Sequence, residues 1–261
     1  MSSILRLLLL FNEGMPQRFV IQFIEHTKMK VVITGGTKGI GWAMVEEFAA
    51  HGFDIAICSR SQEDLTQRAQ ALNKQYPDQE CITQVADMRR KADVIAFADL
   101  IKSSWKEIDI LINNAGVFLP GEIAKEEDGQ LETMIETNLY SAYYLTRALL
   151  PTMIPQKKGH IFNICSIASQ IAYPNGGSYS ISKFALLGFS KVLREELKEQ
   201  GIRVTSILPG ATWSNSWKGV DLPEDRLMQA SDVAKTVYSA FTLSQSAVVE
   251  DIVLRPQLGD L

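Results

Sequence analysis

Cysteine and histidine are both scarce in this sequence. The 261 residues include 3 cysteines and 3 histidines. An odd number of cysteines without a CxxC pair argues against a disulfide framework, and it is compatible with a reducing compartment. The histidines are far apart in the sequence, so they offer no HExxH or comparable metal-ligand spacing. We therefore expect a cytoplasmic protein with no metal site.

An excess of charge of one sign is also missing. Lys and Arg together number 26, Asp and Glu number 30, and the formal net charge is −4. Nucleic-acid binding requires a concentrated excess of Lys and Arg, so we expect no nucleic-acid partner. The apolar run Ile4–Phe11 is far shorter than the roughly 20 residues of a membrane-spanning helix, and no small-residue cleavage site follows it. We expect no membrane partner.

Residues 1–28 differ in character from the rest of the chain. The sequence KVVITGG, typical of the start of a domain, follows directly after Met29. We therefore interpret residues 1–28 as an amino-terminal extension that is poorly ordered. The alternative is an amphipathic contact of residues 19–24 with a membrane or a partner. No Pro-, Gly- or Ser-rich linker divides residues 29–261, which we predict to form a single domain with a substrate loop near 210–230.

Short apolar runs alternate with longer amphipathic runs along this domain. The runs are rich in Val and Ile and nearly unbroken, as is typical of strands that are buried on both faces. Helices are predicted near 39–51, 61–76, 89–105, 127–153, 178–200 and 231–243. The alternation predicts an α/β fold, with a doubly wound parallel sheet of Rossmann type and helices on both faces. The predicted strands are Lys30–Thr34, Asp54–Ser59, Cys81–Ala86, Ile108–Asn113, His160–Cys165, Arg203–Leu208 and Asp251–Leu254.

A glycine-rich turn, Thr34–Gly41, joins the first predicted strand to the first predicted helix. Glycines allow a close approach of backbone to phosphate, and a helix amino terminus directs unpaired N–H groups at it. A P-loop is excluded, because Lys38 is followed by Gly39 rather than by Ser or Thr. The turn therefore predicts a dinucleotide site.

The end of the second strand indicates which dinucleotide binds. An NAD site usually has an acidic residue there, which accepts a hydrogen bond from the ribose 2′-hydroxyl. The segment Cys58–Ser61 contains no carboxylate, whereas Arg60 offers a planar fork for a 2′-phosphate. Lys38, in the glycine turn, offers a second positive charge. These residues predict NADP(H) as the cofactor.

A third pattern concerns catalysis. Tyr179 and Lys183 are four residues apart and so share one face of a helix. Ser166 ends the fifth predicted strand, at the sheet edge where open α/β folds place their sites. The segment Asn113–Gly116 ends the fourth strand, and Asn138 lies on the next helix. No histidine adjoins a nucleophilic serine motif, which argues against a hydrolase.

This set of motifs, TGxxxGxG, NNAG and YxxxK in order, resembles the short-chain dehydrogenase/reductase family over residues 30–255. The resemblance implies a seven-stranded sheet of order 3-2-1-4-5-6-7. It implies that Tyr179 is the acid/base and that Lys183 favours tyrosinate and holds the nicotinamide ribose. Ser166 would hydrogen-bond the carbonyl oxygen, and Asn138 would hold a water that links Lys183 to solvent.

The resemblance also implies a set of cofactor-binding positions. Asp87 would face the adenine amine, and Pro209 and Gly210 would shape the nicotinamide end. The full set is Gly35, Thr37, Lys38, Gly39, Ile40, Gly41, Ser59, Arg60, Asp87, Met88, Asn114, Ala115, Gly116, Tyr179, Lys183, Pro209, Gly210 and Thr212.

The substrate is indicated by the carboxyl-terminal part of the chain. Residues 209–217 and 249–261 are similar to those of bacterial sepiapterin reductases, which reduce a carbonyl side chain on a pterin. Trp213 and Trp217 would stack on the flat heterocycle and Asp260 would accept from its ring nitrogens, beside Ser166 and Tyr179. The alternative is a general carbonyl reductase, a 3-oxoacyl-carrier-protein reductase or another short-chain alcohol dehydrogenase. A Gly-Gly-rich tail typical of the acyl-carrier enzymes is missing here.

Two further interpretations concern behaviour beyond the reaction. A protein of this fold can bind NADP as a regulator without turnover, although the full set of Asn138, Ser166, Tyr179 and Lys183 argues against that here. The predicted helices 127–153 and 178–200 carry apolar residues on more than one face, which predicts a homodimer or homotetramer. These residues include Leu139, Tyr143, Leu149, Phe184, Leu187 and Phe189.

Overall fold

The computed structural model describes residues 28–213 and 221–260. The predictions for residues 1–27, including the poorly ordered extension, and for Trp217 lie outside the described residues.

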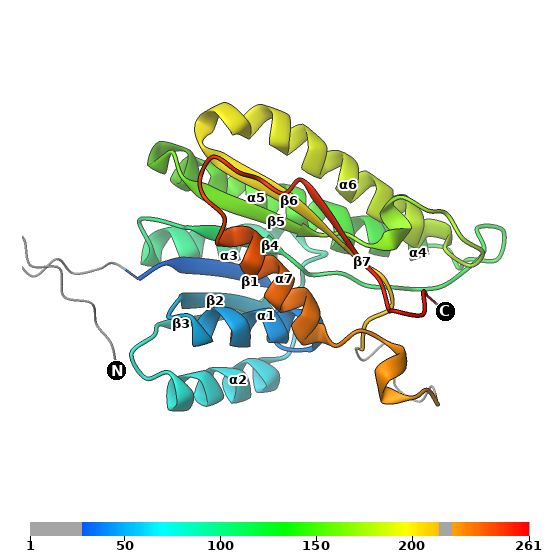
Figure 1. Cartoon of the computed structure of the whole chain (residues 1–261), viewed down its shortest axis with the longest axis horizontal. Helices are drawn as coiled ribbons and strands as arrows, with labels where there is room; N and C mark the ends of the chain where they lie inside the picture. Colours follow the sequence, from blue (N-terminus) through cyan, green and yellow to red (C-terminus); the bar gives the residue numbers. More distant parts are fainter. Residues whose placement is uncertain (1–27, 214–220, 261) are drawn as a thin grey trace, which may run out of the picture.

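A seven-stranded sheet forms the centre of the molecule (Figure 1). Its strand order is β3-β2-β1-β4-β5-β6-β7, and every neighbouring pair is parallel, as predicted. The Val- and Ile-rich strands of the middle of the sheet are buried on both faces, and all eight residues of β6 are buried. The strands are β1 (Lys30–Thr34), β2 (Asp54–Ser59), β3 (Cys81–Val85), β4 (Ile110–Asn113), β5 (Gly159–Ile164), β6 (Ile202–Pro209) and β7 (Asp251–Leu254).

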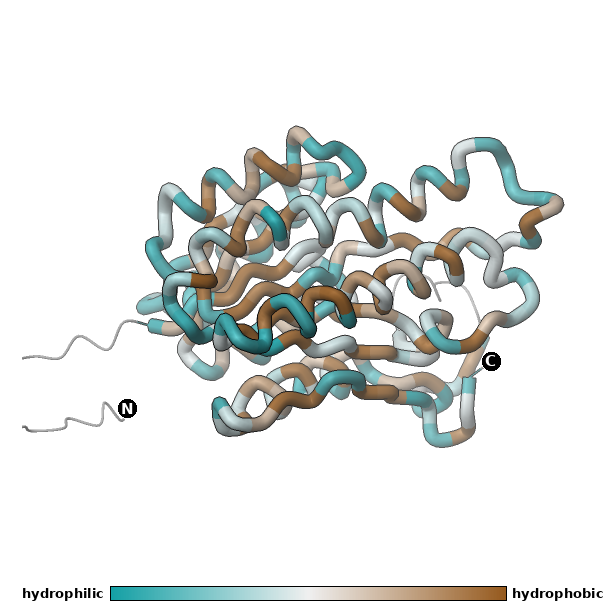
Figure 2. The backbone as a smooth tube through the Cα atoms, turned by 90° about the horizontal axis from the view of Figure 1, so that it is seen from above, coloured by the Kyte–Doolittle hydropathy of each residue, from teal (hydrophilic) through white to brown (hydrophobic). Residues whose placement is uncertain are grey.

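Helices cover both faces of the sheet (Figure 1). On one face lie α1 (Gly39–Ala50), α2 (Gln62–Gln75) and α7 (Ala230–Phe241). The other face carries α3 (Lys91–Ser104), α5 (Ser141–Met153) and α6 (Gly177–Leu197). Hydrophobic segments concentrate in the central strands, and hydrophilic segments lie in the outer turns and helix ends (Figure 2). This arrangement is the predicted doubly wound α/β fold.

Each face has its own hydrophobic cluster. On the first face, Phe48 of α1 packs edge-on against Phe53 and Phe241, with ring centroids 5.0 and 6.4 Å away. On the second face, Phe97 of α3 and Leu145 of α5 are fully buried beside Trp105. Fully burying one such side chain contributes about 1.5–3 kcal/mol, so the two clusters fix the helices on the sheet.

The helix predicted over 127–153 is divided in the structure. It consists of α4 (Gln130–Ile135), a π-helical segment Glu136–Tyr140 and α5. A π-helical turn carries one extra residue per hydrogen-bonded ring and is frequent at functional sites. Asn138 lies at the middle of this segment.

The predicted apolar faces of helices 127–153 and 178–200 are only partly exposed. Leu149 and Leu187 are buried within the chain itself, which corrects the prediction that they need a partner. Tyr143 and Phe184 are exposed, as predicted. The two leucines face the inner layer because α5 and α6 each pack one full side against the sheet.

Among residues 28–213 and 221–260, no helix has the length and hydropathy that a membrane crossing requires.

Candidate active site

The glycine turn lies at the carboxyl end of β1, directly before α1. Gly35 and Gly36 donate their backbone N–H groups to the Cys58 carbonyl at the end of β2, with N–O distances of 3.1 and 3.3 Å. A Cβ atom on Gly41 would lie 2.2 Å from the Gly35 carbonyl oxygen, so a side chain there would open the turn. The tight turn brings the amino terminus of α1 to the sheet edge, where it can bind a phosphate.

Asn114 ties this turn to the end of β4. Its Nδ2 donates to the Thr34 carbonyl at 2.8 Å, and its backbone N–H donates to Thr34 Oγ1 at 2.9 Å. Ala115 donates to the same hydroxyl at 2.8 Å. The loop after β4 and the turn after β1 are therefore held together as one unit. The NNAG motif predicts the position of Asn114 after β4 but does not predict these contacts.

Two basic residues are predicted to bind the 2′-phosphate, Arg60 at the end of β2 and Lys38 in the glycine turn. Arg60 is exposed and Ser59 Oγ accepts from Thr37 Oγ1 at 3.0 Å. Lys38 Nζ forms an ion pair with Asp64 Oδ2 at 2.6 Å, in the first turn of α2. The Lys38 ammonium therefore has a carboxylate partner in this structure, whereas Arg60 is close enough to Asp87 to lower the pKa of that carboxyl.

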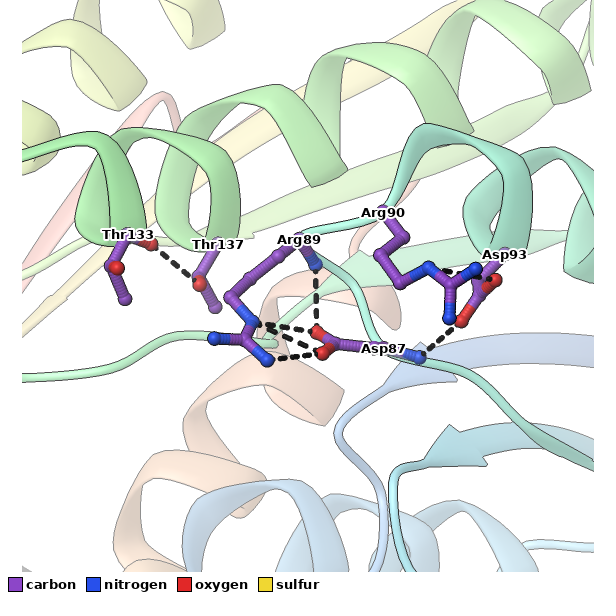
Figure 3. A network of polar contacts seen from close by, with 6 residues as sticks. All are labelled: Asp87, Arg89, Arg90, Asp93, Thr133 and Thr137. Carbon is purple, nitrogen blue, oxygen red and sulfur yellow. Dashed lines mark hydrogen bonds and ion pairs between the residues drawn. The ribbon is translucent and has the colours of Figure 1, made fainter. Parts of the chain in front are cut away.

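Asp87 follows β3 and is held by Arg89, a residue that the sequence analysis missed (Figure 3). The Arg89 Nη2 lies 2.5 Å from Asp87 Oδ2, and its Nε lies 3.0 Å from both oxygens. Hydrogen bonds from the Arg89 side chain hold the pKa of Asp87 below its usual value. No motif marks Arg89, because its importance depends on a contact rather than on a spacing.

Ser166 and Tyr179 meet at the carboxyl end of β5. Ser166 caps the short 3-10 helix Ile167–Ser169, and its Oγ accepts from the Ala168 backbone at 3.1 Å. The same side chain lies near enough to the Tyr179 hydroxyl to interact with it, which lowers the pKa of Tyr179. Burial has the larger, opposite effect and raises the pKa of Tyr179 to about 12. The phenol therefore keeps its proton at neutral pH.

Lys183 lies one helical turn after Tyr179 and is buried. Its Nζ donates to the Ile164 carbonyl at 2.8 Å and lies 5.9 Å from the centre of the Tyr179 ring. Burial lowers the pKa of Lys183 to about 8. A Cβ atom on Gly116 would lie 3.5 Å from this Nζ and 3.2 Å from Asn138 Oδ1. Only a residue without a side chain leaves this space open.

Asn138 uses its whole side chain to join three segments. Its Nδ2 donates to the Val117 carbonyl at 3.0 Å and to Ser182 Oγ at 2.9 Å. Its Oδ1 accepts from the Val117 backbone at 2.8 Å. Ser182 in turn donates to the Tyr179 carbonyl at 2.7 Å. The π-helical segment, the loop after β4 and α6 are thus connected beside Lys183.

Residues from other loops surround Tyr179. Phe118 packs edge-on against the Tyr179 ring, with centroids 4.8 Å apart. Tyr173 interacts electrostatically with both Tyr179 and Asp260, so these side chains lie near one another. The sequence did not single out Phe118 or Tyr173. Phe118 follows the NNAG motif by two residues, and Tyr173 precedes Tyr179 by six residues.

Asp260 lies against the end of β6. Its Oδ1 accepts from the Ala211 backbone at 3.0 Å, and its Oδ2 accepts from Arg255 Nε at 2.7 Å. A Cβ atom on Gly210 would lie 2.0 Å from Oδ1, so the predicted Gly210 provides room for this carboxylate. Thr212 Oγ1 donates to the Gly210 carbonyl at 3.0 Å.

The described part of the predicted substrate loop contains a 3-10 helix, Glu224–Arg226. Arg226 donates to the Gly259 carbonyl at 2.8 Å and to the Asp260 carbonyl at 3.3 Å. The Trp213 backbone donates to the Met228 carbonyl at 2.9 Å. The loop after β6 and the carboxyl-terminal segment therefore hold each other next to the site.

The chain is similar to several known proteins. The family model for short chain dehydrogenase matches residues 29–224. A sepiapterin reductase of Chlorobaculum tepidum is 34% identical over 239 residues, which cover 88% of this chain and 97% of that protein. An NADP-dependent 3-hydroxy acid dehydrogenase of Escherichia coli is 34% identical over 242 residues, covering 87% and 95%.

Solved structures show the same likeness. The crystal structure of L-sorbose reductase from Gluconobacter frateurii, complexed with NADPH and L-sorbose, superimposes with a TM-score of 0.81 at 26% identity. That comparison covers 88% of this chain and 96% of the other.

Proposed function

The chain belongs to the short chain dehydrogenase family, and we propose that it is an NADPH-dependent carbonyl reductase. One observation carries this proposal. Ser166, Tyr179 and Lys183 meet at the carboxyl edge of the sheet, beside a glycine turn that leads into α1. Open α/β sheets bind their ligands at this edge.

The residues at this edge fit NADPH. The tight turn leaves no room for a Cβ on Gly41, so the backbone can approach a phosphate closely, and no carboxylate ends β2 to repel a 2′-phosphate. Arg60 and Lys38 would bind that phosphate, and Lys183 would hold the nicotinamide ribose. NADPH supplies a hydride when it is bound, and the protein supplies orientation, a proton and electrostatic stabilisation.

The protonated phenol of Tyr179 is the proton donor. Its raised pKa keeps the hydroxyl intact at neutral pH, ready to release a proton to a carbonyl oxygen that gains negative charge. Ser166 hydrogen-bonds the same oxygen and stabilises that charge. The carbonyl carbon gains a hydride and the oxygen gains a proton, so a ketone becomes an alcohol. Lys183 and a water held near Asn138 would return a proton to Tyr179.

A pterin with a carbonyl side chain is the substrate class that we propose. The similarity to a sepiapterin reductase supports it, and so does the position of Tyr173, Trp213 and Asp260 around the described end of β6. Asp260 offers negative charge to ring N–H groups, and the aromatic side chains offer flat surfaces.

A 3-oxo acid is the second candidate substrate. Both carboxylate oxygens of Asp260 already accept a hydrogen bond, from Ala211 and from Arg255, which leaves fewer acceptor sites for a pterin. The equal identity to a 3-hydroxy acid dehydrogenase supports this alternative. In that case Asp260 would serve only to hold the loop after β6.

We also propose that residues 29–261 form one domain and that two copies pair through α5 and α6. Strands β1 and β7 belong to one sheet, which supports a single domain. Tyr143 and Phe184 are exposed on these helices, and a cavity of about 610 Å³ is lined by Phe184 together with Ile123 and Ile181. Covering this apolar surface favours association, since monomers rarely expose large apolar patches.

NADPH oxidation with sepiapterin and with a 3-oxobutanoate ester tests the proposed function. We expect turnover of at least one of these carbonyls, and the ratio of the two kcat/KM values separates the pterin from the 3-oxo acid. Binding of NADPH without turnover of any carbonyl would support a regulator instead. Failure to bind NADPH at all would contradict the whole proposal.

A further inference from the structure

Arg89 is held in one place by a single carboxylate. It lies in the loop between β3 and α3, where its backbone N–H donates to Asp87 Oδ1 at 3.1 Å. Its Nε and Nη2 bind the same carboxylate side on (Figure 3). Three N–H groups of Arg89 thus donate to one carboxylate. The two side-chain bonds fix the orientation of the guanidinium plane relative to Asp87.

This pair does little for the stability of the fold. The Arg89 side chain is 44% exposed and that of Asp87 is 20% exposed. Ion pairs in contact with water contribute little to folding, because water screens them and two long side chains must be ordered. A fixed, exposed arginine is therefore better explained by binding than by packing.

The surroundings of Arg89 are those of the adenosine end of the cleft. Asp87 follows β3 and is attracted to Arg60, which follows β2. Arg89 is attracted to Glu136, at the start of the π-helical segment on the other side. The guanidinium therefore lies between the loop after β3 and the segment that carries Asn138. An adenosine bound at the carboxyl ends of β2 and β3 would lie near Asp87, which follows β3 by two residues.

We propose that Arg89 binds the adenine base by stacking its guanidinium on the ring, while Arg60 binds the 2′-phosphate; the inference rests on the proposed use of NADPH. Asp87 engages the N–H edge of the guanidinium, and 44% of the Arg89 side chain remains exposed. A planar, delocalised cation stacks well on an aromatic ring, which an ammonium does not. The pair is thus a prearranged support for the base.

Substitutions of the two arginines should change the Kd values for NADPH and NADH in different ways. Every nicotinamide dinucleotide carries adenine, whereas only NADPH carries the 2′-phosphate. Arg89→Ala is therefore expected to raise the Kd for NADPH and for NADH by the same factor, about 3- to 30-fold, as for a cation–π contact. Arg60→Ala is expected to raise the Kd for NADPH alone.

Two further variants separate stacking from charge. Arg89→Lys keeps the positive charge beside Asp87 but lacks the plane, so we expect it to bind both cofactors as weakly as Arg89→Ala. Arg90→Ala is the matched control, because Arg90 pairs with Asp93 on α3 at 3.7 Å rather than with the Asp87 carboxylate (Figure 3). Its Kd values should equal those of the unaltered protein.

Fluorescence titration of the full chain with NADPH and NADH gives these Kd values. The inference is overturned if Arg89→Ala affects NADPH alone, if Arg89→Lys restores binding, or if Arg89→Ala matches Arg90→Ala. If the unaltered protein binds neither cofactor, the proposed function fails rather than the role of Arg89.

Discussion

The Glu126 carboxylate accepts a hydrogen bond from the backbone N–H of Ser178, 2.8 Å away, one residue before Tyr179. The Ser178 hydroxyl donates to the other oxygen of the same carboxylate. Glu126 belongs to the loop after β4, so this contact joins that loop to the first turn of α6. A carboxylate at a helix amino terminus satisfies free N–H groups and interacts favourably with the helix dipole. The position of Tyr179 thus depends on a residue from another part of the chain.

Glu126→Ala should therefore lower kcat. Loss of such a helix cap costs about 0.5–2 kcal/mol and frees the first turn of α6, so the phenol is held less precisely. The KM for NADPH should change less than kcat, because the glycine turn and Arg60, which are proposed to bind the phosphates, lie outside α6. Steady-state kinetics measure both values.

Glu126→Gln and Glu122→Ala complete this experiment. The amide of Gln keeps an acceptor for Ser178 and should restore much of kcat. Glu122 forms an exposed ion pair with Lys125, so Glu122→Ala should leave kcat unchanged. Equal losses in Glu122→Ala and Glu126→Ala would argue against a positioning role.

Tyr179→Phe should remove the proton donor while the fold and cofactor binding persist. General acid catalysis contributes about 10²–10⁴-fold, so kcat should fall within that range. Tyr140→Phe, at an exposed position, serves as the control. Carbonyl reduction at an unchanged rate in Tyr179→Phe would exclude the role that we assign to this hydroxyl.

Lys183→Met should raise stability and abolish activity. Burial lowers the pKa of Lys183 to about 8, so at neutral pH the folded protein holds a buried charge that the unfolded chain holds in water. Between pH 8 and the usual lysine pKa near 10.5, the unfolded chain binds more protons than the folded protein. The buried charge of Lys183 therefore lowers the free energy of unfolding fully below pH 8, and this effect is lost as the pH rises to 10.5. The variant should melt at a higher temperature at pH 7. A lower melting temperature would show that the hydrogen bond to Ile164 outweighs this penalty.

His160 should make the protein sensitive to mild acid. Its ring is buried against Phe162, with centroids 3.9 Å apart, and its Nε2 lies 2.7 Å from Thr205 Oγ1. Burial, and secondarily Arg203, lowers the pKa of His160 well below 6.5, so the folded protein keeps the ring neutral. The unfolded chain binds a proton as the pH falls through about 6.5, and the free energy of unfolding drops from there on.

Urea unfolding at several pH values tests this expectation. His160→Phe should lose less stability between neutral pH and pH 5 than the unaltered protein does. His51→Gln, at an exposed position, should behave like the unaltered protein. If His160→Phe loses as much stability in acid as the unaltered protein does, groups other than His160 cause that loss.

The sheet could be predicted from sequence because its strands are nearly continuous apolar runs. All residues of β6 are buried, and such a run has few other stable environments. The π-helical segment could not be predicted in the same way. It depends on hydrogen bonds from Asn138 to Val117 and Ser182, which are distant in sequence.

The site shows the same division. Tyr179, Lys183 and Ser166 belong to a pattern whose spacing follows from a helix and a strand end. Glu126 and Arg89 belong to no pattern, because only the folded chain brings Glu126 to Ser178, and an Arg two residues after an Asp is common by chance. Contacts that form only in the folded chain could therefore not be predicted from the sequence.

The carboxylate of Asp260 has a practical consequence for handling the protein. It joins the carboxyl-terminal segment to Ala211 beside the proposed substrate, and it is one residue from the end of the sequence. A tag or support matrix attached after Asp260 would act directly on this contact. Purification handles and surface immobilisation therefore belong on parts of the protein that do not contact Ala211 or Asp260.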